Sequence, residues 1–242
     1  MGKKRRTKKE AIVLFSGGKD SFLTVCLMIE KGFKVHMVNF KTVASIGDQN
    51  VLIGAKRIIE KYGDEKAGFL GIFSIVGIWR ELMFPFLNMK QGEIIKKYGD
   101  ITYSQLNCLT CRSAMYTWCV IKAKISGIKC IADGARKVQG FVIELPMMTD
   151  SFQKFFRDLG IQLVYPVLSL ESGWELKNLL LARGFIPKTS ESQCLLGVPL
   201  LNGTPDRSIQ KAVLSCFQKL VLPKAKKLIE SSFPIEAKEA YL

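Results

Sequence analysis

Histidine and long apolar runs are scarce in this sequence. The one histidine, His36, lies in a stretch that predicts a strand, so it receives no catalytic role and no histidine-based metal site is expected. The longest strongly apolar stretch, Ala67–Trp79, is too short to span a bilayer. The basic start is followed by an apolar run, Ala11–Phe15, that is too short for a signal peptide. We therefore expect no contact with a membrane.

Cysteine is too sparse for a disulfide-stabilised secreted protein. Seven cysteines are scattered over 242 residues, whereas small secreted scaffolds concentrate them. Together with the lack of a targeting segment, this predicts a cytoplasmic protein with reduced thiols. Internal repeats and low-complexity linkers are also missing, and the 48% hydrophobic content is enough for one large domain with a real core.

Acidic residues are outnumbered by basic ones. The chain has 36 lysines and arginines against 21 aspartates and glutamates, a net charge of +15. Residues 1–10 form a basic arm with six basic residues and one acidic residue, which leaves +10 for the remainder. Such an excess predicts a polyanionic partner, and tRNA or another RNA is the usual one. The alternative is a solvated basic surface that only aids solubility.

Apolar runs typical of buried strands alternate with stretches of helical periodicity. The predicted strands are Ala11–Phe15, Val35–Phe40, Ala67–Val76, Lys129–Asp133 and Gln162–Val167. The predicted helices are Asp20–Lys31, Asn50–Tyr62, Arg112–Ser126 and Trp174–Arg183, with an irregular helical excursion over 77–107 and a basic helical stretch over 208–230. This alternation predicts an α/β fold, a doubly wound parallel sheet of about five strands with a C-terminal helical tail.

A loop with two glycines, Ser16-Gly17-Gly18-Lys19-Asp20-Ser21, connects the first strand with the first helix. Its glycines allow backbone N–H groups to approach a phosphate, and the helix start adds a positive dipole end. Lys19 supplies a mobile cation, and the hydroxyls of Ser16 and Ser21 supply further donors. Asp20 would repel phosphate, so we expect it to cap the helix or to hold Mg²⁺ through water. The alternative is a generic turn with a helix cap.

Two further loops follow the second and the fourth strand. Ligands of parallel α/β sheets bind beyond the carboxyl ends of the strands, so all three loops should converge on one site. The second-strand loop begins with Asn39 and Phe40, and the fourth-strand loop contains Gly134 and Arg136. We expect these four residues to contribute to nucleotide binding.

Three cysteines form the second candidate site. Cys108 and Cys111 form a Cys-x-x-Cys motif just before the helix predicted from Arg112, and Cys194 follows far downstream. Three thiolates suit a 4Fe–4S cluster with one open iron better than a structural zinc site, which needs four protein ligands. A Zn²⁺ or redox pair, a catalytic persulfide and inert thiols are the alternatives. Inert, buried positions are expected for the other four cysteines: Cys26, Cys119, Cys130 and Cys216.

The segment AIVLFSGGKDS resembles the N-terminal signature of the PP-loop superfamily, the N-type ATP pyrophosphatases. The resemblance covers 10–197. It implies an adenine nucleotide alpha hydrolase-like fold, cleavage of ATP between its α and β phosphates, Mg²⁺, and an adenylated intermediate. We accordingly expect a basic arm at 1–10, a PP-loop ATPase domain at 11–204 and a helical extension at 205–242.

The order of this loop, the Cys-x-x-Cys motif and one late cysteine resembles the iron–sulfur-dependent tRNA thiolation enzymes that make 2-thiouridine and 2-thiocytidine. In that group such cysteines hold the cluster, which the resemblance places on Cys108, Cys111 and Cys194. Two features differ from the group. Only Cys194 stands where the 2-thiocytidine enzymes carry a second Cys-x-x-Cys motif, and Asp133 to Gln139 replaces a Gly-His-x-x-Asp-Asp segment.

The sequence therefore predicts an AMP-forming sulfurtransferase that adenylates a tRNA nucleobase and replaces its oxygen by sulfur from a persulfide, sulfide or carrier protein. Lys19 and Asp20 would act on the phosphates and Mg²⁺, while Cys108 and Cys194 would handle sulfur. The alternatives are sulfur transfer to a small molecule or cofactor precursor, an amide ligase, and a non-catalytic nucleotide- or RNA-binding module. A homodimer is left open.

Overall fold

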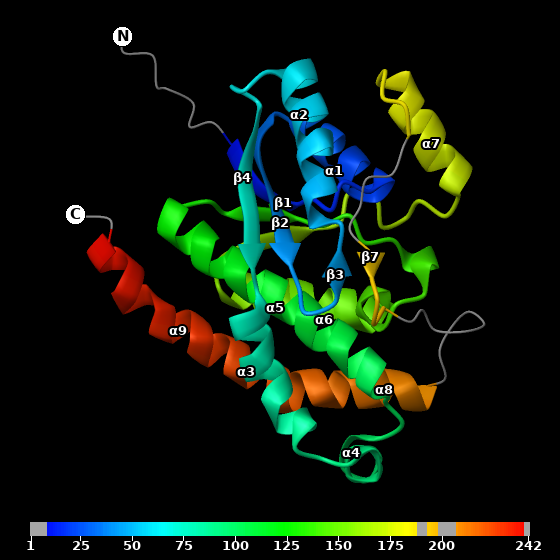
Figure 1. Ribbon diagram of the computed structural model, residues 1–242, viewed down its shortest axis with the longest axis vertical. Coiled ribbons are helices and arrows are strands. Elements are labelled where there is room, and N and C mark those ends of the chain that lie inside the picture. Colours follow the sequence, from blue (N-terminus) through cyan, green and yellow to red (C-terminus); the bar gives the residue numbers. More distant parts are fainter. Residues whose placement is uncertain (1–8, 188–192, 198–206, 240–242) are drawn as a thin grey trace.

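The computed structural model describes residues 9–187, 193–197 and 207–239, and a five-stranded parallel sheet lies at its centre (Figure 1). The strand order is β4-β2-β1-β5-β6, so the chain winds outward in both directions from β1. The strands are β1 (Lys9–Leu14), β2 (Phe33–Lys41), β4 (Ala67–Ser74), β5 (Cys130–Ala132) and β6 (Gln162–Val164). This confirms the predicted doubly wound sheet.

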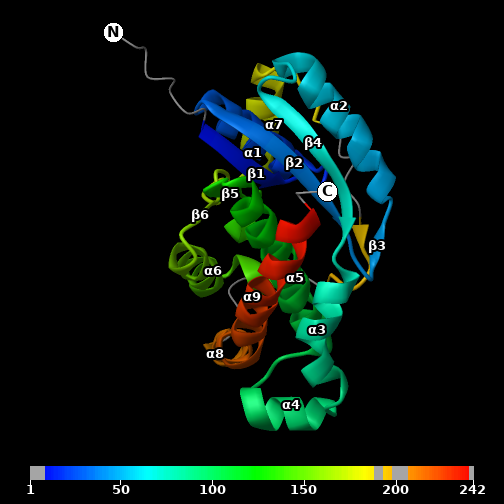
Figure 2. The ribbon, with the colours of Figure 1, turned by 90° about the vertical axis from the view of Figure 1, so that its left-hand side faces the viewer.

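Helices cover both faces of the sheet (Figures 1 and 2). One face carries α1 (Lys19–Glu30), α2 (Val51–Tyr62) and α7 (Gly173–Ala182). The other side carries α3 (Val76–Leu87), α4 (Gln91–Tyr98), α5 (Tyr103–Ser126), α6 (Pro146–Asp158), α8 (Arg207–Cys216) and α9 (Leu222–Glu239). Side chains alternate across β1, so Ala11 and Val13 join the first core while Ile12 and Leu14 join the second.

A second, two-stranded sheet was not predicted. It pairs β3 (Ser45–Ile46) with β7 (Gln193–Cys194) in antiparallel fashion, with Ser45 opposite Cys194. The backbone N–H of Leu195 also donates to the carbonyl of Ala44 at 3.0 Å. This pairing brings the late cysteine segment to the carboxyl end of β2, although the two segments are far apart in the sequence.

The helical excursion predicted over 77–107 is present, but most of it is regular helix, so its predicted irregularity is wrong. The helix expected near Arg112 begins at Tyr103, because Thr102 and Gln105 form a capping box: each side chain accepts the other's backbone N–H. Cys108 and Cys111 therefore lie inside α5 and not in a loop before it. Aromatic and polar residues are mixed in this stretch, so the apolar residues do not recur at a clear helical spacing.

Pro85 lies inside α3, where a proline removes one helical hydrogen bond. The carbonyl of Glu81, which would have accepted that bond, accepts one from the Lys224 ammonium of α9 at 3.2 Å. The contact between distant segments offsets the loss and ties α9 to α3. No helix in the described ranges has the length and apolarity that crossing a bilayer would require.

Two further elements differ from the sequence predictions. Helix α6 was not predicted; it begins with Pro146 and buries three phenylalanines, Phe152, Phe155 and Phe156. The C-terminal helical stretch is present, but a π-helical segment (η4, Phe217–Val221) separates α8 from α9. Both helices pack against α5 in one hydrophobic core, so the C-terminal segment is integrated with the preceding fold.

Candidate active site

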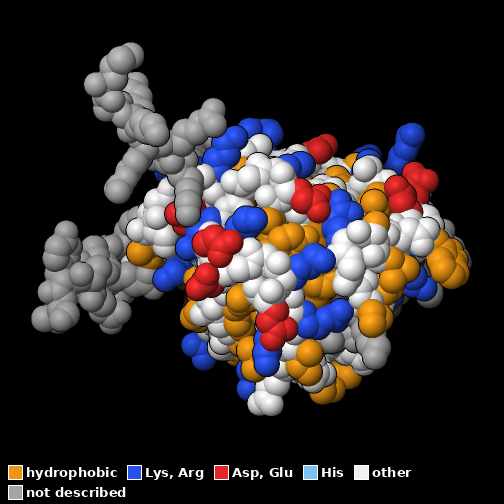
Figure 3. All heavy atoms as spheres, turned by 90° about the horizontal axis from the view of Figure 1, so that it is seen from above, with side chains coloured by type: hydrophobic (Ala, Val, Ile, Leu, Met, Phe, Trp, Pro, Cys, Tyr) orange, Lys and Arg blue, Asp and Glu red, His pale blue; other side chains and the backbone are white. Residues whose placement is uncertain are grey.

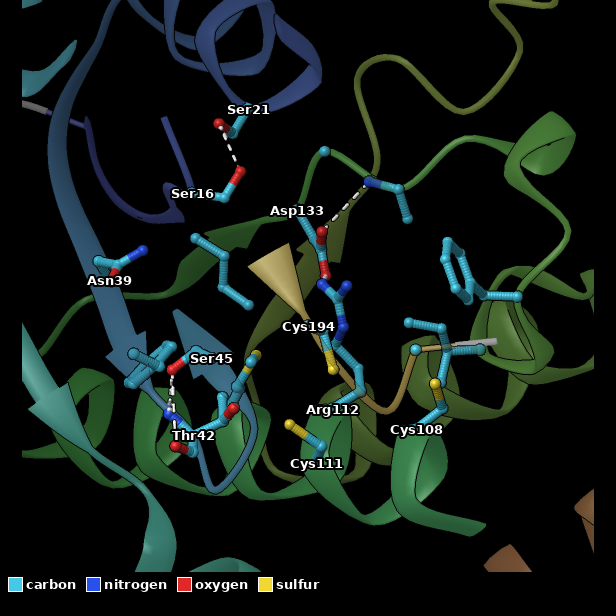
Figure 4. Close-up of a pocket in the computed structure, with 18 of the residues that line it drawn as sticks. Ser16, Ser21, Asn39, Thr42, Ser45, Cys108, Cys111, Arg112, Asp133 and Cys194 are labelled. Carbon is cyan, nitrogen blue, oxygen red and sulfur yellow. Dashed lines mark hydrogen bonds and ion pairs between the residues drawn. The ribbon is translucent and has the colours of Figure 1, made fainter. Parts of the chain in front are cut away.

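A cavity of about 690 Å³ lies beyond the carboxyl ends of β1, β2 and β5 (Figure 4). Residues from all three loops that the sequence singled out line it, together with residues of α5, of the 3-10 helix η3 (Val142–Glu144) and of β7. The volume is in the range of small-molecule sites. The predicted convergence of the three loops is confirmed, and the cysteine motif shares the same cavity.

The glycine-containing loop forms one end of the cavity. Gly17 has a φ of 79°, a left-handed conformation that suits glycine. The Ser16 hydroxyl accepts the Gly18 N–H at 3.2 Å and lies 3.2 Å from the Ser21 hydroxyl, which donates to the Gly18 carbonyl. Ser16, Asp20 and Ser21 line the cavity, whereas Gly17, Gly18 and Lys19 do not. Hydroxyl groups and the start of α1 thus face the space together.

Gly134 brings the loop after β5 against the start of α1. A β-carbon at this position would lie 2.9 Å from the Ser21 nitrogen and 3.0 Å from the Asp20 carbonyl carbon. These are backbone atoms and cannot move aside as a flexible side chain can. Only glycine allows the two loops to approach this closely.

Asp20 does not cap α1, so that alternative is wrong. The N-cap residue is Gly18, and no side chain makes a cap hydrogen bond. Instead the Asp20 carboxylate forms an ion pair with Arg136, with 2.5 Å between Nε and Oδ1. Arg136 does not line the cavity; its ion pair connects the loop after β5 with the glycine-containing loop, called the phosphate loop below.

Asn39 and Phe40 line the cavity at the end of β2. The Asn39 side chain is 4% exposed, and its amide nitrogen donates to the Phe15 carbonyl at 2.9 Å. Its Oδ1 atom is buried without a hydrogen-bond partner. Such an acceptor is costly unless a ligand satisfies it, so this position is suited to a donor group on a bound molecule.

Three thiols face the same cavity from two elements. Cys108 and Cys111 are three residues apart on α5 and so share a face of the helix, while Cys194 comes from β7 (Figure 4). Cys194 is exposed, and the other two are half-buried. Burial raises the pKa of Cys108 to about 11 and of Cys111 to about 12, while the nearby Arg112 guanidinium opposes the rise.

The three residues line one cavity, but they are not arranged as the ligands of one metal site. Among the residues that the structure describes, no three His, Cys, Asp or Glu side chains are grouped so that they could hold a metal ion. As placed, the thiols do not fit a cluster or a zinc site, and the 4Fe–4S cluster stays a prediction. The remaining four cysteines are buried in the core, as predicted: Cys26, Cys119, Cys130 and Cys216.

A buried polar network beside the thiols was missed from the sequence. Arg112 pairs with Asp133, whose carboxylate also accepts the Tyr116 hydroxyl at 2.6 Å and the Ala135 N–H at 3.2 Å. Glu144 lies in the cavity wall, 3% exposed, and burial raises its pKa to about 7. Arginine directly after the second cysteine was the one available sign of this network.

Comparison with known proteins identifies the family. The family model described as "Thiamine biosynthesis protein (ThiI)" matches residues 6–140, more than half of the 242 residues. The chain belongs to the ThiI family. It therefore contains a ThiI-like PP-loop ATP pyrophosphatase domain, as the glycine-containing loop predicted; the comparison does not single out the 2-thiouridine and 2-thiocytidine group.

One solved structure shares the fold of this ThiI-family chain. A 4-thiouridine synthetase, solved with RNA and bound ATP, superposes with a TM-score of 0.60 at 16% identity, over 94% of this chain and 54% of that one. The chain thus spans about half the length of that relative. NMN synthetase from Francisella tularensis superposes with a TM-score of 0.47 at 14% identity, over 94% of this chain and 84% of that one. None of the curated proteins compared with the chain matches it.

Proposed function

We propose that this chain is an AMP-forming, ATP-dependent sulfurtransferase domain that thiolates a nucleobase of RNA. The observation that supports this most is the single cavity that joins the phosphate loop to three cysteine thiols. Adenylation of a carbonyl oxygen and its replacement by sulfur require those two groups on opposite sides of one substrate. The 4-thiouridine synthetase with a similar fold was solved with RNA and ATP, which favours the same substrate class here.

ATP would lie with its phosphates at the loop and its base at the end of β2. The N–H groups at the start of α1 and the hydroxyls of Ser16 and Ser21 would bind the phosphates, with Lys19 as a further cation. The unpartnered Oδ1 of Asn39 would accept a hydrogen bond from the exocyclic amino group of adenine. Guanine offers a carbonyl oxygen at the equivalent position, so this acceptor favours ATP over GTP.

Mg²⁺ would accompany the phosphates of ATP. Asp20 is the carboxylate on the loop, and oxygen ligands of this kind suit Mg²⁺, either directly or through water. When the metal binds, the Asp20 carboxylate would either lengthen its ion pair with Arg136 or contact Arg136 and the metal together. When bound, the ion would neutralise phosphate charge, and the chain's own groups would orient the substrate.

Sulfur would pass through Cys194 because it is the exposed thiol of the three. A persulfide on Cys194 attacks the adenylated carbon: the carbon–sulfur bond forms, and AMP leaves with the former carbonyl oxygen. Cys108 or Cys111 then attacks the Cys194 sulfur, which releases the thiolated base and leaves a disulfide that an external thiol reduces. Arg112 stabilises the thiolate form of the attacking cysteine.

Positive charge supports RNA as the partner. The net charge is +15, and lysines gather on η4 and α9 at Lys219, Lys224, Lys226 and Lys227. The face shown in Figure 3 instead mixes basic and acidic side chains, so the phosphate backbone would follow another surface.

The test is an assay for AMP, pyrophosphate and thiolated product with ATP, tRNA and a persulfide donor. Cys194→Ser should abolish thiolation and the AMP release that accompanies it but keep RNA-dependent pyrophosphate formation, because the phosphate loop is unchanged. Cys216→Ser, a cysteine buried in the helical core, is the matched control and should retain thiolation. Release of ADP and phosphate by the wild type contradicts the adenylation claim, and activity without RNA supports a small-molecule substrate. An iron–sulfur spectrum in anaerobically purified protein, lost in Cys194→Ser, would show the cluster form of the site.

A further inference from the structure

The cavity wall contains a carboxyl group to which the proposed chemistry has assigned no role. Glu144 ends the 3-10 helix η3 and is 3% exposed, yet it lines the cavity together with Phe141 and Ile143. An acidic residue is rarely buried this deeply unless it is paired or functional.

Glu144 differs from the two other carboxylates of the cavity, Asp20 and Asp133. Asp20 forms an ion pair with Arg136, and Asp133 forms one with Arg112 and accepts two further hydrogen bonds. Glu144 takes part in none of the ion pairs seen in the described ranges. Its Oε2 accepts the Phe141 N–H at 3.3 Å, and the Arg136 backbone N–H is a second donor. Its charge is therefore not neutralised by a partner.

Glu144 has neighbours that belong to both ends of the cavity. Arg136, whose backbone N–H donates to Glu144, forms the ion pair with Asp20 of the phosphate loop. Arg112 lowers the pKa of the Glu144 carboxyl group and Asp133 raises it. The Glu144 carboxylate in turn raises the pKa of the Cys108 thiol. A base held for adenylation at the phosphate loop and for attack by sulfur must pass the same region. Burial raises the pKa of Glu144 to about 7, a value suited to accepting and returning a proton near neutral pH.

We propose that Glu144 is the general base of the adenylation step, and that it takes the proton of the N–H group that flanks the reacting carbonyl in a uracil-type base, the base class of the 4-thiouridine synthetase of similar fold. This inference rests on the function proposed above. In the first step the base oxygen bonds to the α-phosphorus, the bond from that phosphorus to the pyrophosphate oxygen breaks, and the ring N–H proton moves to the Glu144 carboxylate. In the second step sulfur bonds to the ring carbon and AMP leaves with the oxygen. The proton returns to the ring nitrogen when the second cysteine breaks the bond to Cys194 and releases the thiolated base.

The ring proton is what makes a base necessary. If the carbonyl oxygen of uracil attacked while the N–H stayed in place, the adenylated ring would carry a positive charge. Removing the proton leaves a neutral adenylate and makes the oxygen a better nucleophile. Cytosine has no proton on the corresponding ring nitrogen, so the role of Glu144 as a base applies to a uracil-type substrate.

The variant that tests the inference is Glu144→Gln. Glutamine keeps the shape and the carbonyl acceptor for the Phe141 N–H, but it cannot take a proton at neutral pH. RNA-dependent AMP and pyrophosphate formation should fall about 10²–10⁴-fold, with the Kd for ATP and for tRNA unchanged. Glu144→Asp keeps the carboxylate on a shorter side chain, so its rate should lie between the rates of the wild type and of Glu144→Gln. The wild-type rate should rise with pH up to about 7, and that inflection should be absent from Glu144→Gln.

Glu93→Gln is the matched control, because Glu93 also accepts a backbone N–H three residues before it, that of Lys90, but lies on α4.

A purely structural role for Glu144 would be exposed by substrate rescue. RNA carrying 5-fluorouridine, whose ring proton is more acidic, should restore part of the Glu144→Gln rate and none of the rate lost in Asp20→Ala.

Two results separate this inference from the proposed function. If the wild type forms no AMP and pyrophosphate with RNA, the proposed function is wrong and the role of Glu144 falls with it. If the wild type is active and Glu144→Gln retains its rate within about fivefold, or loses rate without rescue by 5-fluorouridine, only the general-base assignment is wrong.

Discussion

Replacing Gly134 by alanine tests whether the close approach of two loops sets the geometry of the phosphate site. The new β-carbon would lie 2.9 Å from the Ser21 nitrogen, 3.0 Å from the Asp20 carbonyl carbon and 3.1 Å from the Ser21 α-carbon. Ordinary contacts begin at about 3.4 Å, so the loop after β5 and the start of α1 must separate by roughly 0.5 Å. Both partners are backbone, and no rotamer change relieves the overlap.

The expected cost of Gly134→Ala is about 1–3 kcal/mol of unfolding free energy, the usual range for an overpacked interior site. For a chain of this size that corresponds to about 2–4 °C in Tm for each kcal/mol. The displaced atoms are those of the phosphate loop, so ATP binding should weaken by a similar free energy. The Kd for ATP should therefore rise about tenfold for each 1.4 kcal/mol. Denaturant unfolding and calorimetric titration with ATP measure the two effects.

Two glycines offer a control. An added β-carbon meets nothing within 4 Å at Gly77 of α3 or Gly92 of α4, so alanine there should leave ATP binding unchanged and raise helix stability by up to about 1 kcal/mol. If Gly134→Ala unfolds and binds ATP as the wild type does, the loops are not held at the distance seen here and the reasoning is wrong.

Three further outcomes follow from the charges. Arg112→Met should lower unfolding free energy by about 3–5 kcal/mol because it leaves buried Asp133 unpaired, whereas Arg183→Met, at a more exposed pair, should cost at most about 1 kcal/mol in denaturant melts. Glu144 has a pKa raised from 4.5 to about 7, so the native state binds more protons than the unfolded state between these values. Wild-type stability should therefore fall as pH rises from about 4.5 to 7, by up to about 3 kcal/mol, and a Glu144→Gln variant should not show this slope. Affinity for tRNA should decrease steeply with salt, and deleting residues 1–9 should reduce it only in part; undetectable binding at low salt would count against an RNA substrate.

One cavity brings the phosphate loop and three cysteines together. Helix α5 presents Cys108, Cys111 and Arg112 on the turns that face the sheet edge, and the pairing of β3 with β7 adds Cys194 from the opposite side. The cysteines thus depend on a helix and a strand pair rather than on a flexible loop. A site built on regular elements holds its side chains at defined distances from one another.

Local patterns in the sequence were sufficient for the sheet and the phosphate loop. The run Ala11–Phe15 gave β1 because continuous apolar residues are typical of a strand buried on both faces, and Gly17 and Gly18 mark the tight turn that follows it. Since parallel strands end at one edge, the same pattern predicted that Asn39 and Gly134 would meet Ser16 in one site.

Tertiary structure decided the features that depend on partners distant in the chain. Helix α3 contains Pro85, a residue that is unfavourable inside a helix. The Lys224 ammonium of α9 donates to the Glu81 carbonyl that lacks its helical partner because of this proline. The position of Cys194 depends on strand pairing with Ser45, and no local period records which segments pair. Glu144 looks like a surface residue in the sequence; only the packing of η3 against the cavity removes it from water and raises its pKa. Burial and pairing are properties of the folded chain, so the proton chemistry of this site became visible only in three dimensions.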